Sequence, residues 1–180
     1  MKKILTEKYL KFAALHGVPN RDITKYFQSP SFWGVFSVND GANIKRALKK
    51  RTEQLFNSCI VNLSKKNTPG SHFVTLMWYP DQKVLYYLDP SGLPPFQWYI
   101  EKLLYRTLKT QFVYYNYARF QKLGSNFCAY YCIYFILLYQ ALSEGKKKLI
   151  AQLKPLAEVQ TTQIKQDKTL IQNIVLLLKK

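Results

Sequence analysis

The pattern of hydrophobic and polar positions predicts a β-rich centre in this chain. Two runs of β-branched and aromatic residues, 73–79 and 84–88, flank the turn-forming residues 80–83, which predicts a hairpin. Shorter runs at 59–63 and 112–117 are also typical of strands. The middle of the chain therefore predicts a small sheet.

Hydrophobic positions at helical spacing predict helices before, between and after these strands. The segments with this spacing are residues 4–15, 43–56, 96–108, 128–139 and two stretches of the tail, around 149–153 and 170–178. Residues 29–36, which combine turn formers with aromatic residues, predict a loop. Together these elements predict an α+β protein with a central sheet flanked by helices.

Length and composition add limits to this picture. A chain of 180 residues with 48% hydrophobic content predicts one domain, residues 1–180, with a substantial core. The apolar run 127–139 is shorter than the roughly 18 to 20 residues that cross a bilayer, so we expect a core helix and no membrane contact. Charged Glu7 and Lys8 interrupt any signal-peptide core, and three cysteines predict free thiols in the cytoplasm or nucleus.

The net charge of +17 predicts attraction to a polyanion such as DNA. The alternative is a solvated, lysine-rich surface with no such partner. Neither an Arg-rich recognition helix nor a zinc-ligand spacing is present, so we expect any DNA contact to be non-specific and no metal to bind.

A cysteine carries the strongest indication of chemistry. The polar loop 121–127 delivers Cys128 to the first turn of the apolar helix, where backbone N–H groups and the helix dipole favour a thiolate. The alternative is an ordinary core cysteine. Cys132, one turn later, and Cys59, in a strand, predict core thiols.

A thiol nucleophile needs a base, and the chain has two histidines. His16 ends the first predicted helix, where a surface position or a helix cap is expected. His72 precedes the first hairpin strand and Asp89 follows the second, so a symmetric antiparallel register places them directly opposite each other. The alternative is a loop histidine near a turn-forming aspartate.

The loop before Cys128 supplies further candidates. The side-chain amide of Gln121 could join the Cys128 backbone N–H as a donor to an oxyanion, although a loop glutamine is usually just solvated. Ser125 and Asn126 are candidate N-cap residues for the helix.

These residues carry a resemblance to the adenovirus-type maturation proteases, and more closely to their relatives in virophages and Maverick/Polinton-type viruses. The similar segments share their order and spacing with the family: 32–40, Gly70-Ser71-His72-Phe73, 87–95, Tyr115-Asn116, Gln121 and 125–132. The similarity spans about residues 32–139, and residues 145–180 form a helical C-terminal extension outside it. Two positions depart from the family: Ala129 stands where it usually has Gly, and Phe73 where it usually has Trp.

The resemblance implies a papain-like fold with Cys128 as nucleophile, His72 as base, Asp89 as its orienting group and Gln121 in the oxyanion hole. It implies a monomeric endopeptidase that cleaves capsid or core precursor proteins in the host cytoplasm or nucleus, is packaged in the virion, and is activated by DNA and a viral peptide. Two alternatives stay open. One is an isopeptidase for ubiquitin-like modifiers, and the other is a non-catalytic basic DNA-binding virion protein.

Overall fold

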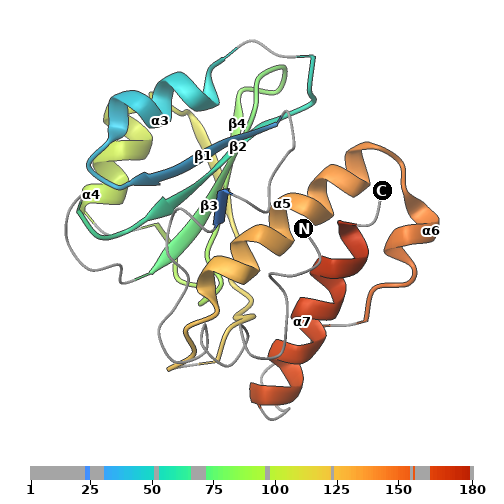
Figure 1. Ribbon diagram of the computed structural model, residues 1–180. Helices are drawn as coiled ribbons and strands as arrows, with labels where there is room; N and C mark the ends of the chain where they lie inside the picture. Colours follow the sequence, from blue (N-terminus) through green and yellow to red (C-terminus); the bar gives the residue numbers. More distant parts are fainter. Residues whose placement is uncertain are drawn as a thin grey trace.

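The computed structural model describes residues 23–24, 31–50, 53–65, 72–95, 98–122, 124–154, 156 and 163–178. Its centre is a five-stranded sheet with the order β1-β2-β3-β4-β5 (Figure 1). The strands are β1 (Phe32–Ser37), β2 (Asn57–Asn62), β3 (Phe73–Tyr79), β4 (Val84–Leu88) and β5 (Phe112–Tyr115). The outer pairs β1–β2 and β4–β5 are parallel and the inner pairs are antiparallel, so the sheet is mixed.

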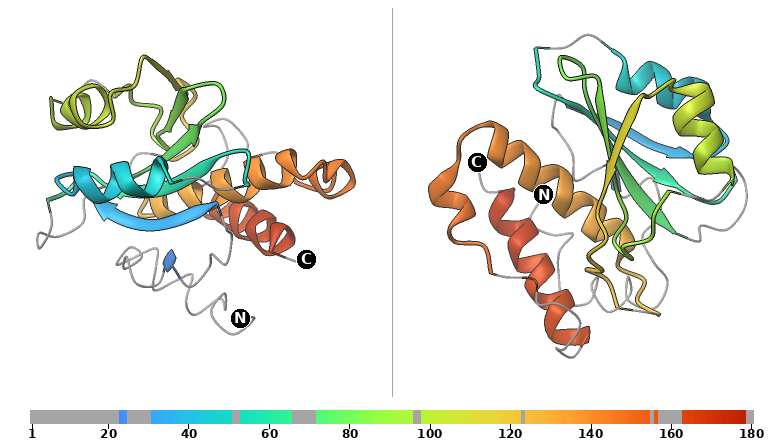
Figure 2. Two further views of the ribbon diagram at one scale, coloured as in Figure 1. Left: turned by 90° about the horizontal axis from the view of Figure 1, so that it is seen from above. Right: turned by 180° about the vertical axis from the view of Figure 1, so that it is seen from behind.

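Helices cover both faces of this sheet (Figure 2). One face carries α3 (Gly41–Leu48) and α4 (Trp98–Glu101), which continues into the π-helical segment η1 (Lys102–Thr107). The other face carries α5 (Cys128–Ser143), which is followed by α6 (Lys147–Ile150) and α7 (Gln163–Leu177). The α+β class and the central mixed sheet are confirmed, while the helix predicted at residues 4–15 lies outside the described residues.

The inner strands are buried because side chains alternate between the two helical layers. In β2, Cys59 and Val61 face the core under α3 and η1, whereas Ile60 faces the core under α5. In β3, Val74 and Leu76 also face the core under α3 and η1, and Met77 faces the core under α5. The sheet is therefore the middle of three layers, and it fixes the start of α5 relative to the hairpin.

The loop predicted at residues 29–36 is wrong, because most of it forms β1. Gly34 adopts a left-handed φ of 125°, and the pairing with β2 shifts register between Phe32 and Val35. A bulge of this kind needs a residue that tolerates an unusual backbone conformation, and glycine does. The turn-forming residues of this segment therefore belong to an irregular edge strand.

The helix predicted at residues 43–56 is also too long. It ends at Leu48 because the buried side chain of Asn57 donates to the carbonyl oxygens of Leu48 (2.8 Å) and Lys50 (2.7 Å). These bonds satisfy carbonyls that the end of a helix leaves open, and they tie the start of β2 to the end of α3. A cap supplied by the first residue of the next strand has no local sequence signature.

The C-terminal extension packs on the domain through α7. Leu170 and Ile174 of α7 are fully buried in the core that α5 shares with the sheet. Hydrophobic residues all round α5 are explained by this arrangement, since α5 is covered by the sheet on one side and by α7 on the other. None of the described helices is long and apolar enough to cross a bilayer.

Candidate active site

Cys128 is the first residue of α5, and its side chain lies at the edge of the core with 8% exposure. Phe127 occupies the N-cap position, with no side-chain capping bond. The predicted capping by Ser125 or Asn126 is therefore wrong, although Ser125 Oγ accepts the Phe127 N–H at 3.3 Å. The Cys128 sulfur therefore lies at the N-terminal end of a helix, which is the positive end of the helix dipole.

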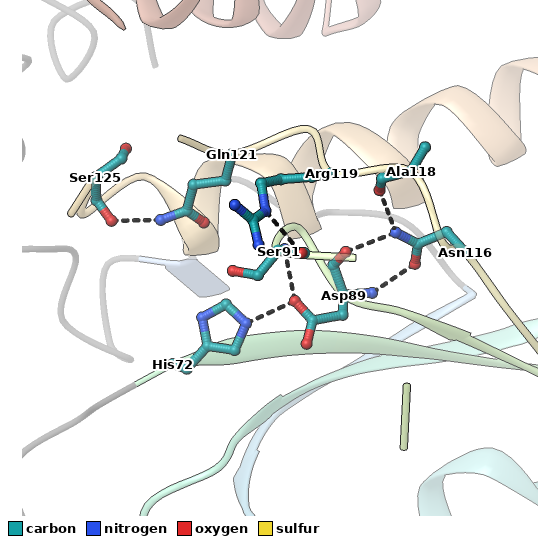
Figure 3. Close-up of polar contacts among 8 residues, drawn as sticks. All are labelled: His72, Asp89, Ser91, Asn116, Ala118, Arg119, Gln121 and Ser125. Carbon is teal, nitrogen blue, oxygen red and sulfur yellow. Dashed lines mark hydrogen bonds and ion pairs between the residues drawn. The ribbon is translucent and has the colours of Figure 1, made fainter. Parts of the chain in front are cut away.

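His72 and Asp89 meet at the open end of the β3–β4 hairpin. His72 Nε2 lies 2.7 Å from Asp89 Oδ1, with side-chain exposures of 19% and 1% (Figure 3). A carboxylate only accepts hydrogen bonds, so Nε2 carries the proton. The other ring nitrogen, which points away from Asp89, is left to interact with a second group (Figure 3).

The register of the hairpin differs from the predicted one by two residues. Tyr79 pairs with Val84 and Thr75 with Leu88, so continuation of this ladder sets Asp89 opposite Val74. His72 and Asp89 are thus diagonal neighbours, not direct partners. Because side chains alternate with a period of two, a two-residue shift keeps both groups on the same face. The predicted contact therefore forms despite the wrong register.

The His72 imidazole interacts with Cys128 as well as with Asp89. Desolvation on burial lowers this pKa, but hydrogen bonds and charge interactions with Asp89 and Cys128 outweigh it and raise the pKa to about 9. The imidazole is therefore held as an imidazolium at neutral pH, between a carboxylate and a thiol. The structure brings three of the four predicted site residues together in this way.

Asn116 holds Asp89 in place, a role that the sequence did not reveal. Its Oδ1 accepts the Asp89 backbone N–H (2.8 Å), and its Nδ2 donates to the carbonyl oxygens of Asp89 (2.7 Å) and Ala118 (2.9 Å). The β4–β5 pairing of Tyr87 with Tyr115 brings Asn116 next to Asp89. This parallel pairing joins distant segments, so the proximity of Asn116 to Asp89 can be recognised only once the strand order is known.

The Asp89 carboxylate is itself oriented by the following turn. Oδ1 accepts the Ser91 backbone N–H at 2.6 Å in addition to the His72 bond, whereas Oδ2 is buried without a hydrogen-bond partner among the described residues. Arg119 Nε donates to the Ser91 carbonyl at 3.3 Å. The turn after β4 and the loop after β5 therefore support Asp89 from two sides (Figure 3).

Gln121 lies close to the loop that leads to Cys128. It is buried, and its Nε2 donates a hydrogen bond to the Ser125 carbonyl oxygen. The Oε1 atom is buried without a hydrogen-bond partner among the described residues. The role in an oxyanion hole predicted for Gln121 requires the second hydrogen of Nε2, because the first is used by Ser125.

The remaining candidates from the sequence are the other two cysteines, the other histidine and a metal site. Cys59 and Cys132 are fully buried thiols, and burial raises the pKa of each, as expected of core cysteines. His16 lies outside the described residues. Within the described part of the chain, no group of three His, Cys, Asp or Glu side chains is placed to hold a metal ion.

No protein-family model matches the chain, and no curated protein matches it either.

Gly92 provides a test of how tightly the two loops of the site pack. We expect Gly92→Ala to lower the free energy of unfolding by about 2 to 4 kcal/mol, because Gly92 has a φ of 67° and an added Cβ would lie 2.8 Å from the Tyr117 carbonyl oxygen. The matched control is Gly145→Ala, with a φ of 66° and no atom within 4 Å of its Cβ position. Urea unfolding of both variants measures the difference. Equal losses would show that the loop contact is not needed for stability.

Proposed function

We propose that this protein is a cysteine endopeptidase with a papain-like fold, and that it cleaves capsid or core precursor proteins during virion maturation. The observation that carries the proposal is the position of the His72 imidazole, which is bonded to Asp89 Oδ1 at 2.7 Å and interacts with both Asp89 and Cys128. A thiol, an imidazole and a carboxylate in this sequence of contacts are the groups that acyl transfer through a thioester requires.

The proposed reaction has two steps. The Cys128 thiolate attacks the carbonyl carbon of the scissile peptide bond, and the His72 imidazolium gives its proton to the leaving amine as the C–N bond breaks. Water then attacks the thioester with neutral His72 as base, which releases the acid and restores the thiolate. The Asp89 carboxylate stabilises the imidazolium in both steps.

The substrate and the partners are supported by resemblance and by charge. The segments similar to adenovirus-type maturation proteases include all four proposed site residues, Cys128, His72, Asp89 and Gln121. The net charge of +17 supports an enzyme concentrated on packaged DNA, since release of counterions favours binding of a basic protein to phosphates. An activating peptide is proposed from the resemblance alone.

A covalent peptide probe tests the nucleophile. We expect a peptidyl vinyl sulfone to label wild-type protein at one site, Cys128→Ala to lose at least 100-fold of the labelling rate, and Cys132→Ala to label at the wild-type rate within about threefold. Cys132 is the matched control because it lies one turn along the same helix and is fully buried. Intact-mass measurement and peptide mapping locate the adduct.

Labelling that persists in Cys128→Ala, or an adduct on Cys132, would contradict the assignment of the nucleophile. Cleavage assays with capsid-precursor peptides and with diglycine-tailed modifiers then separate the endopeptidase from an isopeptidase. Addition of DNA over a range of salt concentrations tests the charge argument, because a rate that does not respond to salt would exclude phosphate contacts.

A further inference from the structure

The C-terminal extension reaches the loop that carries Gln121. Gln166 lies in the first half of α7, is 5% exposed, and its Nε2 donates to the Phe120 carbonyl oxygen at 2.5 Å. The extension therefore makes a buried polar contact with the backbone next to a predicted site residue. This part of the chain lies outside the segments that suggested the function.

The peptide unit between Phe120 and Gln121 is held at both ends. Its carbonyl oxygen accepts from Gln166, and its N–H group, which belongs to Gln121, donates to the Pro90 carbonyl oxygen at 2.8 Å. The Phe120 N–H also donates to Pro90, at 2.9 Å. Because a peptide unit is planar, fixing both ends sets its orientation and therefore the direction in which the Gln121 side chain leaves the backbone.

The helix that supplies Gln166 is itself firmly anchored. Leu170 and Ile174 are fully buried against α5. Asn173, also on α7, accepts the Lys154 backbone N–H at 3.0 Å and donates to the Lys154 carbonyl at 2.8 Å. The Phe120 ring packs edge-on against Phe135 of α5, with 5.3 Å between ring centroids. A donor on α7 therefore has a fixed position relative to α5, where Cys128 lies.

We infer that Gln166 is a positioning residue for the oxyanion site: through the Phe120–Gln121 peptide unit, α7 orients the Gln121 amide relative to Cys128. The inference rests on the proposed function and makes the C-terminal extension part of the acyl-transfer machinery. The Gln166 contact is made to the backbone of the loop that carries Gln121, so its removal should affect the oxyanion and leave the thiolate–imidazolium pair intact.

The test uses Gln166→Met, which keeps the length of the side chain and removes its donor. The matched control is Gln172→Met, an exposed glutamine on the same helix whose Oε1 accepts from Lys154 Nζ at 3.1 Å. Two rates are compared in the full-length protein: turnover of a cleavable peptide, which develops an oxyanion, and alkylation of Cys128 by iodoacetamide, which does not. Thermal unfolding is recorded for each variant.

We expect Gln166→Met to lower kcat about 10-fold or more, with KM and the alkylation rate within about twofold of wild type. Gln172→Met should match wild type in all three. An unchanged kcat, or a parallel fall of kcat and alkylation, would overturn the inference, since the latter shows general disordering of the site. Wild-type protein that is alkylated at Cys128 but cleaves no peptide would instead overturn the proposed function, and the inference with it.

Discussion

His72→Ala is expected to lower kcat/KM by about 1,000-fold or more, because the thiol loses both its ion-pair partner and the acid that protonates the leaving amine. The imidazole is held between Asp89 and Cys128, with its pKa raised to about 9 by these two groups. In the variant the thiol has no adjacent cation to favour its ionised form. Alkylation of Cys128 by iodoacetamide should therefore slow most at about pH 6, where an unpaired thiol is protonated.

The control for this prediction is the other histidine of the chain. His16→Ala should retain wild-type turnover and alkylation, since His16 is expected on the surface or at a helix end. Kinetics of peptide cleavage and the pH dependence of alkylation are measured for both variants. Alkylation that is indifferent to His72→Ala would show that no thiolate–imidazolium pair exists, and peptide cleavage at the wild-type rate would exclude His72 as the acid.

Asp89→Asn is expected to move the alkaline limit of activity. In the wild-type protein, kcat/KM should fall as pH rises through about 9, because His72 then loses the proton that the leaving amine needs. The amide introduced by Asp89→Asn would keep an oxygen for the bonds from His72 and Ser91 but would lack the charge that stabilises the imidazolium. The limit should therefore shift down by roughly one to three pH units. At pH values between the alkaline limit of the variant and that of the wild type, the activity of Asp89→Asn should be about 10- to 1,000-fold below that of the wild type.

The same pair affects stability with a defined sign. The folded-state pKa of His72 lies above its ordinary value of 6.5, so the protonated imidazole stabilises the fold below about pH 6.5, and this contribution is lost as pH rises to about 9. Urea unfolding across this pH range should show a smaller loss of the free energy of unfolding in Asp89→Asn than in the wild type. Asp81→Asn, in the exposed turn of the same hairpin, is the control. It should leave the pH dependence of kcat/KM and the pH dependence of stability unchanged. A wild-type alkaline limit retained by Asp89→Asn would refute the role of the carboxylate.

The parts of the fold that the sequence predicted well are those with local causes. The hairpin strands β3 and β4 have the predicted bounds because a four-residue turn, 80–83, separates two uniformly β-rich runs. The start of α5 at Cys128 follows from a polar loop that meets an apolar segment. The register was predicted two residues away from the observed one, and the His72–Asp89 contact still formed because that shift preserves the face.

The features that the sequence did not predict depend on contacts between distant segments. Asn57 ends α3 through side-chain bonds to the backbone of the preceding element, and Asn116 secures Asp89 through bonds to a backbone 27 residues away. Gln166 reaches Phe120 across 46 residues. An isolated polar residue has many possible partners, so its sequence position gives no indication of which backbone it will hold. These residues become visible only when strand order and helix packing are known.

The two halves of the candidate site differ in how far apart their residues lie along the chain. His72 and Asp89 are 17 residues apart in a single hairpin, a separation that loop closure bridges at small entropic cost. Cys128 joins them only when α5 packs on the sheet, and Gln166 only when α7 packs on α5. During synthesis we therefore expect the acid–base pair to form early and the thiol to be engaged late. A partly made chain would then carry no functioning nucleophile that could attack its neighbours.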